Sequence, residues 1–158
     1  MNTSPALPTQ ASSAAVSVNK GNAALANAAE VSGRFLLALL FLLSGLGKLG
    51  AYSATAAYMA AAGVPGALLP AVIAIEIFGS LAIVLGWKTR VTASLLAGFS
   101  VLTALAFHNN LADQTQMIMF FKNISISGAF LLLFANGAGP LSLDRRATQH
   151  ASHRQPYP

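Results

Sequence analysis

Four apolar stretches, separated by short polar segments, dominate the chain between residues 31 and 135. They cover residues 31–48, 67–86, 91–107 and 117–135. A helix needs roughly 17 to 25 residues to cross a bilayer, whereas a membrane β-strand needs only about ten. The pattern therefore predicts an all-α fold, a bundle of four transmembrane helices.

Polar and helix-breaking segments mark the limits of this membrane domain. A "GVPG" turn precedes the second stretch, and "NGAGP" ends the fourth. Residues 1–29 are rich in Ala, Ser and Asn and lack the basic start and apolar run of a signal peptide, so we expect a disordered tail there. We expect a single membrane domain over residues 30–145 and a basic C-terminal tail over residues 146–158.

Composition agrees with the pattern and narrows the function. Hydrophobic residues make up 55% of the 158 and charged residues 8%, whereas about a quarter of a soluble domain is charged. The net charge is +5, and the nine Lys and Arg residues lie in short loops, at span ends and in the tail. They form no basic face interleaved with aromatics, which argues against nucleic-acid binding. The sequence has no Cys, which excludes disulfides and thiolate-held iron–sulfur clusters. Any electrons must therefore be carried by another group.

The distribution of Lys and Arg predicts the orientation in the membrane. Lys88 and Arg90 lie in the loop between the second and third stretches, and Arg145, Arg146 and Arg154 follow the fourth. These two segments are on the same side of a four-span chain, and positive residues in short loops resist translocation. We therefore expect both termini and the "WKTR" loop to be cytoplasmic.

Glu76 lies near the middle of the second stretch, where an ionised carboxylate facing lipid costs roughly 2.5 to 3.5 kcal/mol. We predict that it faces the bundle interior, either protonated or paired with a cation. Lys122, about one turn inside the outer end of the fourth stretch, is the favoured partner. Gly79 and Ser80, three and four residues after Glu76, leave space for another helix. Arg34 could reach Glu76 from the inner side.

The remaining polar residues of the spans complete a candidate binding site. Arg34 is expected near the inner end of the first span, and Lys48, His108, Lys122 and Asn123 at or just inside the outer ends. For Arg34 and Lys48 taken singly, snorkelling to the headgroups is the favoured interpretation. The candidate site comprises Glu76, Lys122, Asn123, His108, Lys48 and Arg34. No metal site and no catalytic residue are predicted. Haem is disfavoured because His108 is the only His near any span.

Several segments in order resemble a known family. They are "GRFLLALLFLLSGLGKL", a "GVP" turn, "EIFGSLAIVLGWKTR", His108, "FFKN", Gly128 and "GAGPLSLD". Over residues 30–145 they resemble the DoxX family of small bacterial four-helix membrane proteins. The resemblance implies a multi-pass protein of the bacterial inner membrane. The relatives it points to include a subunit of a thiosulfate:quinone oxidoreductase and components linked to membrane oxidoreductase complexes.

Two classes of function follow from this reading. The first is a membrane subunit of, or partner to, a quinone-linked oxidoreductase. No covalently bound cofactor is expected, but quinone is a candidate ligand, with His108, Lys122 and Asn123 near its carbonyls and Glu76 exchanging protons. The second is a non-catalytic scaffold or assembly protein whose buried polar residues fix helix register. A carrier of protons or a small solute is a further alternative. The expected partners are the lipid bilayer and either oxidoreductase subunits or further copies of the chain; whether the protein is an enzyme is left open.

Overall fold

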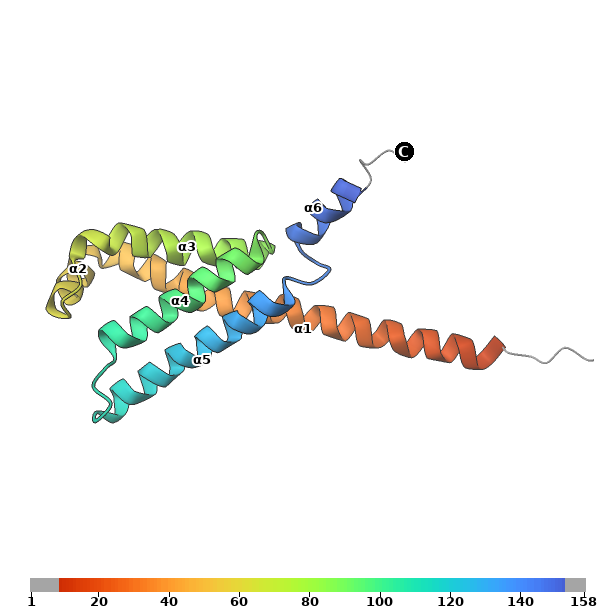
Figure 1. Cartoon of the computed structure of the whole chain (residues 1–158), viewed down its shortest axis with the longest axis horizontal. Coiled ribbons are helices and arrows are strands. Elements are labelled where there is room, and N and C mark those ends of the chain that lie inside the picture. Colours follow the sequence, from red (N-terminus) through yellow and green to blue (C-terminus); the bar gives the residue numbers. More distant parts are fainter. Residues whose placement is uncertain (1–8, 153–158) are drawn as a thin grey trace, which may run out of the picture.

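The computed structural model describes residues 9–152, with side chains from residue 21 to residue 150. This part of the chain is helical and contains no strand (Figure 1). Its elements are α1 (Thr9–Gly50), α2 (Tyr52–Ala61), the 3-10 turn η1 (Gly66–Leu68), α3 (Leu69–Leu85), α4 (Thr89–Phe107), α5 (Gln114–Asn136) and α6 (Leu143–Ser152).

Within the described residues, four helical segments are long and apolar enough to cross a membrane. They are Gly21–Gly50, Gly66–Leu85, Thr89–Phe107 and Gln114–Asn136. The all-α class and the four predicted spans are therefore confirmed, with ends that differ by a few residues except at the start of the first. The orientation of the bundle stays a prediction.

Both regions predicted as tails contain helix. The division into a tail over residues 1–29 and a membrane domain from residue 30 stays a prediction. In the structure, α1 begins at Thr9, so residues 9–29 are helical and continue into the first span. Their high Ala content favours helix, and an existing helix propagates more easily than a new one starts. After the fourth span, α6 begins at Leu143 with Asp144 in its first turn, where a negative charge stabilises the helix. Residues 1–8 and 153–158 lie outside the described part.

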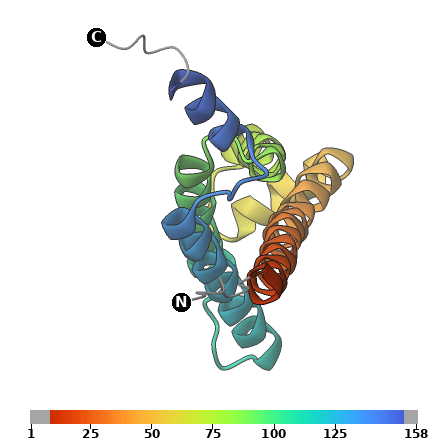
Figure 2. The ribbon, with the colours of Figure 1, turned by 90° about the vertical axis from the view of Figure 1, so that its right-hand side faces the viewer.

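The bundle consists of two helix pairs, α1 with α3 and α4 with α5, and α3 also packs along α4. In the end-on view of Figure 2, α4 and α5 lie on one side and α1 on the other. The pairs meet in an apolar core in which the ring of Phe41 from α1 packs edge-to-face on Phe130 from α5, with centroids 5.4 Å apart. Gly45 allows close approach within the first pair, because a Cβ there would lie 2.8 Å from the Ile77 side chain.

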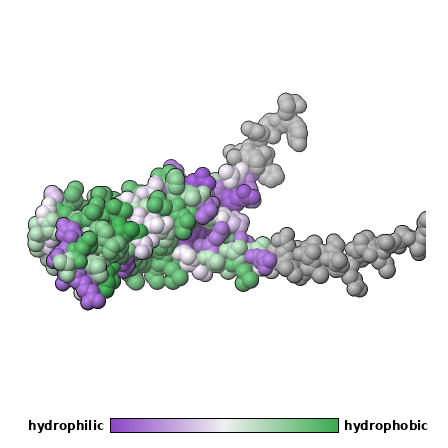
Figure 3. Space-filling view, turned by 60° about the horizontal axis from the view of Figure 1, so that its bottom comes forward, coloured by the Kyte–Doolittle hydropathy of each residue, from purple (hydrophilic) through white to green (hydrophobic). Residues whose placement is uncertain are grey.

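The outer surface of the bundle is apolar. Figure 3 shows hydrophobic residues over most of the face in view, with hydrophilic groups toward its ends. Large side chains such as Leu36, Phe78 and Leu132 are about two-thirds exposed, at 66%, 70% and 67%. So much exposed apolar surface suits a lipid environment, and the backbone groups of helices are already paired as lipid requires.

Candidate functional site

A cavity of about 660 Å³ lies between the two helix pairs, at the end of the bundle that carries α2 and the α4–α5 loop. Residues from α1, α2, α3, α4 and α5 line it, and most of its surface is apolar. Pockets that bind small molecules typically have volumes of roughly 300 to 1,000 Å³ and combine apolar walls with a few polar groups. This cavity has that character, and the polar groups determine what it can bind.

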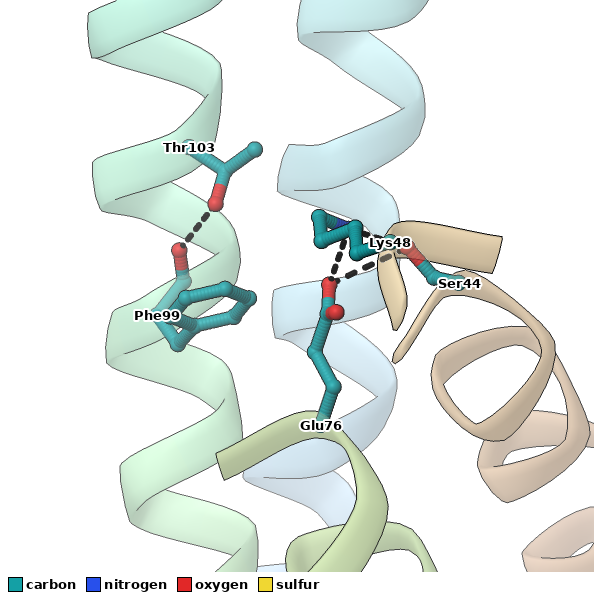
Figure 4. A network of polar contacts seen from close by, with 5 residues as sticks. All are labelled: Ser44, Lys48, Glu76, Phe99 and Thr103. Carbon is teal, nitrogen blue, oxygen red and sulfur yellow. Dashed lines mark hydrogen bonds and ion pairs between the residues drawn. The ribbon is translucent and has the colours of Figure 1, made fainter. Parts of the chain in front are cut away.

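Glu76 of α3 is the centre of a polar network on the cavity wall (Figure 4). Its Oε1 accepts hydrogen bonds from Lys48 Nζ at 2.8 Å and from Ser44 Oγ at 3.1 Å. Lys48 Nζ also donates to Ser44 Oγ at 2.6 Å. Ser44 and Lys48 are four residues apart on α1, so they share the helix face that packs on α3. The network thus links α1 to α3, the first helix pair, at the depth of the cavity.

Glu76 is only 4% exposed, yet its second oxygen is not satisfied within the described residues. Oε2 is buried and has no hydrogen-bond partner there. An unsatisfied buried acceptor costs about 1 to 3 kcal/mol, and more when it is charged. A donor group brought by a ligand, or a proton on the carboxylate, would remove this penalty.

The predicted pair between Glu76 and Lys122 is wrong. Lys122 Nζ donates to Met119 Sδ at 3.1 Å, one turn earlier on α5, and the ion pair of Glu76 is with Lys48. The reason is the pairing of helices: α5 packs on α4, whereas α1 packs on α3, and Gly45 brings α1 close to Glu76. Lys48 is therefore turned inward, not snorkelling. The space at Gly79 is filled by Leu96 of α4.

Lys122, Asn123 and His108 all line the cavity, as does the Lys48–Glu76 pair. Asn123 Nδ2 donates to the Met119 carbonyl oxygen at 3.0 Å, which leaves its Oδ1 as an acceptor. His108 Nδ1 lies 2.8 Å from Gln116 Oε1. With that oxygen as acceptor, Nδ1 carries the hydrogen and Nε2 of a neutral ring is an acceptor. Five of the six predicted site residues therefore share one cavity.

Arg34 is the predicted site residue that the structure places elsewhere. It is 3% exposed and lies at the opposite end of the bundle, where Nη1 donates to the Val84 carbonyl oxygen at 3.2 Å and Nη2 to that of Leu141 at 2.7 Å. The favoured interpretation, snorkelling, and the alternative left open, a pair with Glu76, are both wrong for Arg34. Its guanidinium satisfies a carbonyl at the C-terminus of α3, where a positive charge is favoured.

Arg34 is part of a set of contacts that we call the clasp. Asp144 Oδ1 accepts from the Lys88 backbone N–H at 2.7 Å and Oδ2 from that of Thr89 at 2.8 Å, while the Asp144 N–H donates to the Gly86 carbonyl oxygen at 2.9 Å. The clasp comprises Arg34, Gly86, Lys88, Thr89, Leu141 and Asp144. Burial raises the pKa of Asp144, but the hydrogen bonds from Thr89 and Lys88 outweigh it, so the pKa lies below its usual value.

Ser44, Tyr58 and Thr103 also line the cavity, and the sequence did not single them out for this role. Ser44 had a usable signal, because it precedes Lys48 by one helical turn within an apolar span. Thr103 Oγ1 donates to the Phe99 carbonyl oxygen at 2.9 Å (Figure 4), so its position on the cavity wall follows only from helix packing. Among residues 21–150, whose side chains the structure describes, no three His, Asp or Glu side chains gather to hold a metal ion.

Comparison with known proteins places this arrangement in a family. The sequence profile of the DoxX family matches residues 29–109, from the membrane part of α1 to the end of α4. The chain belongs to the DoxX family. The predicted DoxX-like domain starts one residue later and also includes α5, which lies beyond the match; its boundary at residue 145 stays a prediction.

Two curated relatives from Escherichia coli (strain K12) are similar over most of their lengths. "Inner membrane protein YqjF" is 50% identical over 112 residues, which cover 71% of this chain and 86% of the relative. "Inner membrane protein YphA" is 40% identical over 121 residues, which cover 72% and 86%. No solved structure matches. Together with the four apolar helices, these relatives identify a multi-pass bacterial inner-membrane protein of the DoxX family.

Proposed function

We propose that this DoxX-family protein is the membrane subunit of, or partner to, a quinone-linked oxidoreductase, and that a quinone binds in the 660 Å³ cavity. The observation that carries the proposal is the combination of a mostly apolar cavity with a buried carboxylate that has one oxygen satisfied and one free. A quinone takes up two electrons and two protons when it is reduced. Its ring and tail need apolar walls, and its oxygens need polar partners.

The residues present fit such a ligand. Tyr58 and Phe107 stack with ring centroids 5.4 Å apart, and Phe41 and Phe99 lie 6.3 Å apart, so aromatic faces line the cavity. Lys122 has donor protons beyond its contact with Met119 Sδ, and an ammonium group is a suitable donor to a carbonyl oxygen. Aromatic walls orient the ring, and the Lys donor fixes one of its oxygens.

Glu76 provides the proton chemistry of the proposal. Lys48 stabilises its ionised form through Oε1, and Oε2 is then free to accept a hydrogen bond or a proton. Because the chain has no Cys, electrons reach the cavity from a partner protein. The chain's own role is to hold the ligand at a fixed depth and to relay protons: the Glu76 carboxylate takes up a proton at Oε2 and donates it to an oxygen of the quinone as the quinone is reduced.

A binding experiment tests this directly. Purified protein in detergent is titrated calorimetrically with a short-chain ubiquinone analogue, for the parent, Glu76→Gln, Lys122→Gln and the control Arg146→Gln, whose charge lies on α6 at the other end of the molecule. We expect saturable binding by the parent and the control, and a loss of about tenfold for Lys122→Gln, close to the 1.5 to 3 kcal/mol of a hydrogen bond to a charged group. Glu76→Gln should bind the oxidised quinone about as well as the parent, because an ionised carboxylate and a quinone carbonyl are both acceptors. Absence of saturable binding, or equal binding by all four proteins, would refute the site.

The oxidoreductase role needs a second measurement. Quinone reduction is followed in membranes that contain the protein together with the products of its neighbouring genes, with the parent compared with Glu76→Gln. We expect reduction to depend on the parent protein and to fall with the variant at equal membrane yield. If the products of the neighbouring genes reduce quinone equally well without this chain, the chain takes no part in electron transfer to quinone.

A scaffold remains the second candidate function, and the geometry of the ion pair favours it specifically. Lys48, Ser44 and Glu76 join α1 to α3 at one depth, so they fix the register of the first helix pair whether or not a ligand binds. On this view Glu76→Gln, which can still hydrogen-bond to Ser44 and Lys48, leaves complex assembly unchanged, whereas Glu76→Leu, which breaks the link between α1 and α3, weakens it. Co-purification of neighbours with each variant separates the two functions.

A further inference from the structure

The other end of the bundle carries a second hollow, a groove of about 850 Å³ that is unrelated to the quinone cavity. It lies between the start of α4, the end of α5 and the segment that leads into α6. Three cationic side chains line it: Lys88, Arg90 and Arg145. All three residues are exposed.

Two carboxylates lie at or near the groove: Glu30 of α1 lies against Gly139, which lines it, and Asp144 lines it directly. Asp144 is the acidic residue among those that line it, and both of its carboxylate oxygens accept backbone hydrogen bonds from the start of α4. The cations are not paired with acids within the described residues, where the ion pair is that of Lys48 with Glu76. Arg90 Nη2 donates to the Ala135 carbonyl oxygen at 3.3 Å, which leaves the rest of its guanidinium available.

The position of the groove identifies the class of anion. It lies where α3 ends and α4 begins, and Trp87, over whose ring Lys88 Nζ lies at 5.6 Å, is a residue type enriched at membrane interfaces. Val91, which also lines the groove, is 67% exposed on the apolar outer surface of the bundle. A ligand with a phosphate in the groove can therefore extend its acyl chains along the outer face of α4.

We propose that this groove binds the headgroup of an anionic glycerophospholipid, with its phosphate between Arg90, Lys88 and Arg145. The guanidinium of Arg90 matches the geometry of two phosphate oxygens, and the other two cations add charge. The proposal concerns a different part of the molecule from the quinone cavity. Either site can therefore exist without the other.

The experiment measures lipid binding by native mass spectrometry of the delipidated full chain in detergent. Phosphatidylglycerol and phosphatidylcholine are titrated separately against the parent, Arg90→Gln, Arg145→Gln and Arg146→Gln. Arg146 is the matched control, because it is the neighbouring cation of α6 but does not line the groove. Thermal unfolding of each variant confirms that it is folded. Among the described residues the Arg145 side chain makes no hydrogen bond or ion pair, so Arg145→Gln leaves the fold intact.

We expect the parent to bind phosphatidylglycerol more tightly than phosphatidylcholine. Each groove substitution should weaken phosphatidylglycerol binding about fivefold, as expected for one cation near an anionic lipid, while Arg146→Gln should change it less than about twofold. Equal affinity for both lipids, or an equal loss from Arg146→Gln, would overturn the proposal, because attraction would then come from overall surface charge. Glycerol phosphate should compete poorly; full competition would show a site for free phosphate and overturn the assignment to a lipid.

Discussion

At the scale of single residues, Glu76 is stabilised by a partner on the adjacent helix of its own pair. A buried ion pair gains stability only when its geometry is good, and the removal of one member is more damaging than the removal of both. Lys48 Nζ lies 2.8 Å from Glu76 Oε1, and Ser44 adds a second donor. These contacts make the stability of single and double variants informative.

The first prediction concerns this pair. Glu76→Leu and Lys48→Leu should each lower the free energy of unfolding by about 3 to 5 kcal/mol, since each leaves an unpaired charge, and the double variant should recover most of the loss. Thermal unfolding in detergent measures the effect. Lys122→Leu is the control and should change stability little, because its ammonium hydrogen-bonds to the weak acceptor Met119 Sδ and has no ion pair among the described residues. A large loss from Lys122→Leu with none from Lys48→Leu would contradict the observed pairing.

The second prediction concerns Arg34. One guanidinium joins the Val84 and Leu141 carbonyl oxygens, and the compact ammonium of Lys cannot span both. Arg34→Lys should therefore lower stability by about 1.5 to 3 kcal/mol, the range for one lost hydrogen bond to a charged group. Thermal unfolding in detergent measures it, with Arg146→Lys as the control. Unchanged stability would mean that a single one of these bonds is sufficient.

At the scale of helices, the start of α4 receives its cap from a distant part of the chain. Its own preceding residue, Lys88, has φ 45° and gives no side-chain hydrogen bond, and Asp144 supplies the carboxylate instead. First-turn N–H groups need such acceptors, and an anion near them is further favoured by the helix dipole. The cap therefore ties the helix to the segment that follows α5.

The third prediction uses the lowered pKa of Asp144. A carboxyl whose pKa is lower in the folded state adds stability above its ordinary pKa of 3.8 and loses it as pH falls through the lowered value. Asp144→Asn should therefore cost about 1 kcal/mol at pH 7. The difference from the parent should shrink below pH 3.8. Thermal unfolding at a series of pH values measures it; a difference that grows on acidification would contradict the assignment.

Hydropathy is a property of each segment by itself, and it predicted the class and the four spans. Partners are not local. Glu76 was correctly expected to face the interior. The choice of Lys48 or Lys122 as its partner depends on which helices are neighbours, and the depth of each residue within its span does not determine that. The same holds for Arg34, whose acceptors come from residues 84 and 141. Most polar residues of the cavity could be predicted because polar groups are rare in these spans. The position of Thr103 on the cavity wall could not, because it depends on helix packing.

At the scale of the whole molecule, the basic groove and the two ends of the bundle give a testable orientation. Reporter fusions after Arg146 and at Gln114 should report opposite compartments, with the former cytoplasmic, because Lys88, Arg90, Arg145 and Arg146 share one end. The same compartment for both would contradict four spans. Opposite compartments with Gln114 cytoplasmic would reverse the orientation.

The extended start of α1 supports a prediction about the tail. Residues 21–30 are exposed apart from Asn27, which is half-buried, so most of this segment has few contacts with the bundle. Deletion of residues 2–28 should leave membrane yield and thermal stability nearly unchanged, since little buried surface is lost. Membrane fractionation and unfolding in detergent measure both. A large loss of either would show that the tail contributes to the folded bundle.

The clasp also joins segments of the chain that are synthesised at different times. During translation α1 and α3 are synthesised before α4 and α5, so the α1–α3 pair can form first. Leu141 and Asp144 emerge after all four spans, yet they hold the guanidinium of the first span and the N-terminus of the third. The segment synthesised last therefore bonds to helices synthesised before it. A chain that ends before Leu141 contains all four spans but lacks the hydrogen bonds of Leu141 and Asp144.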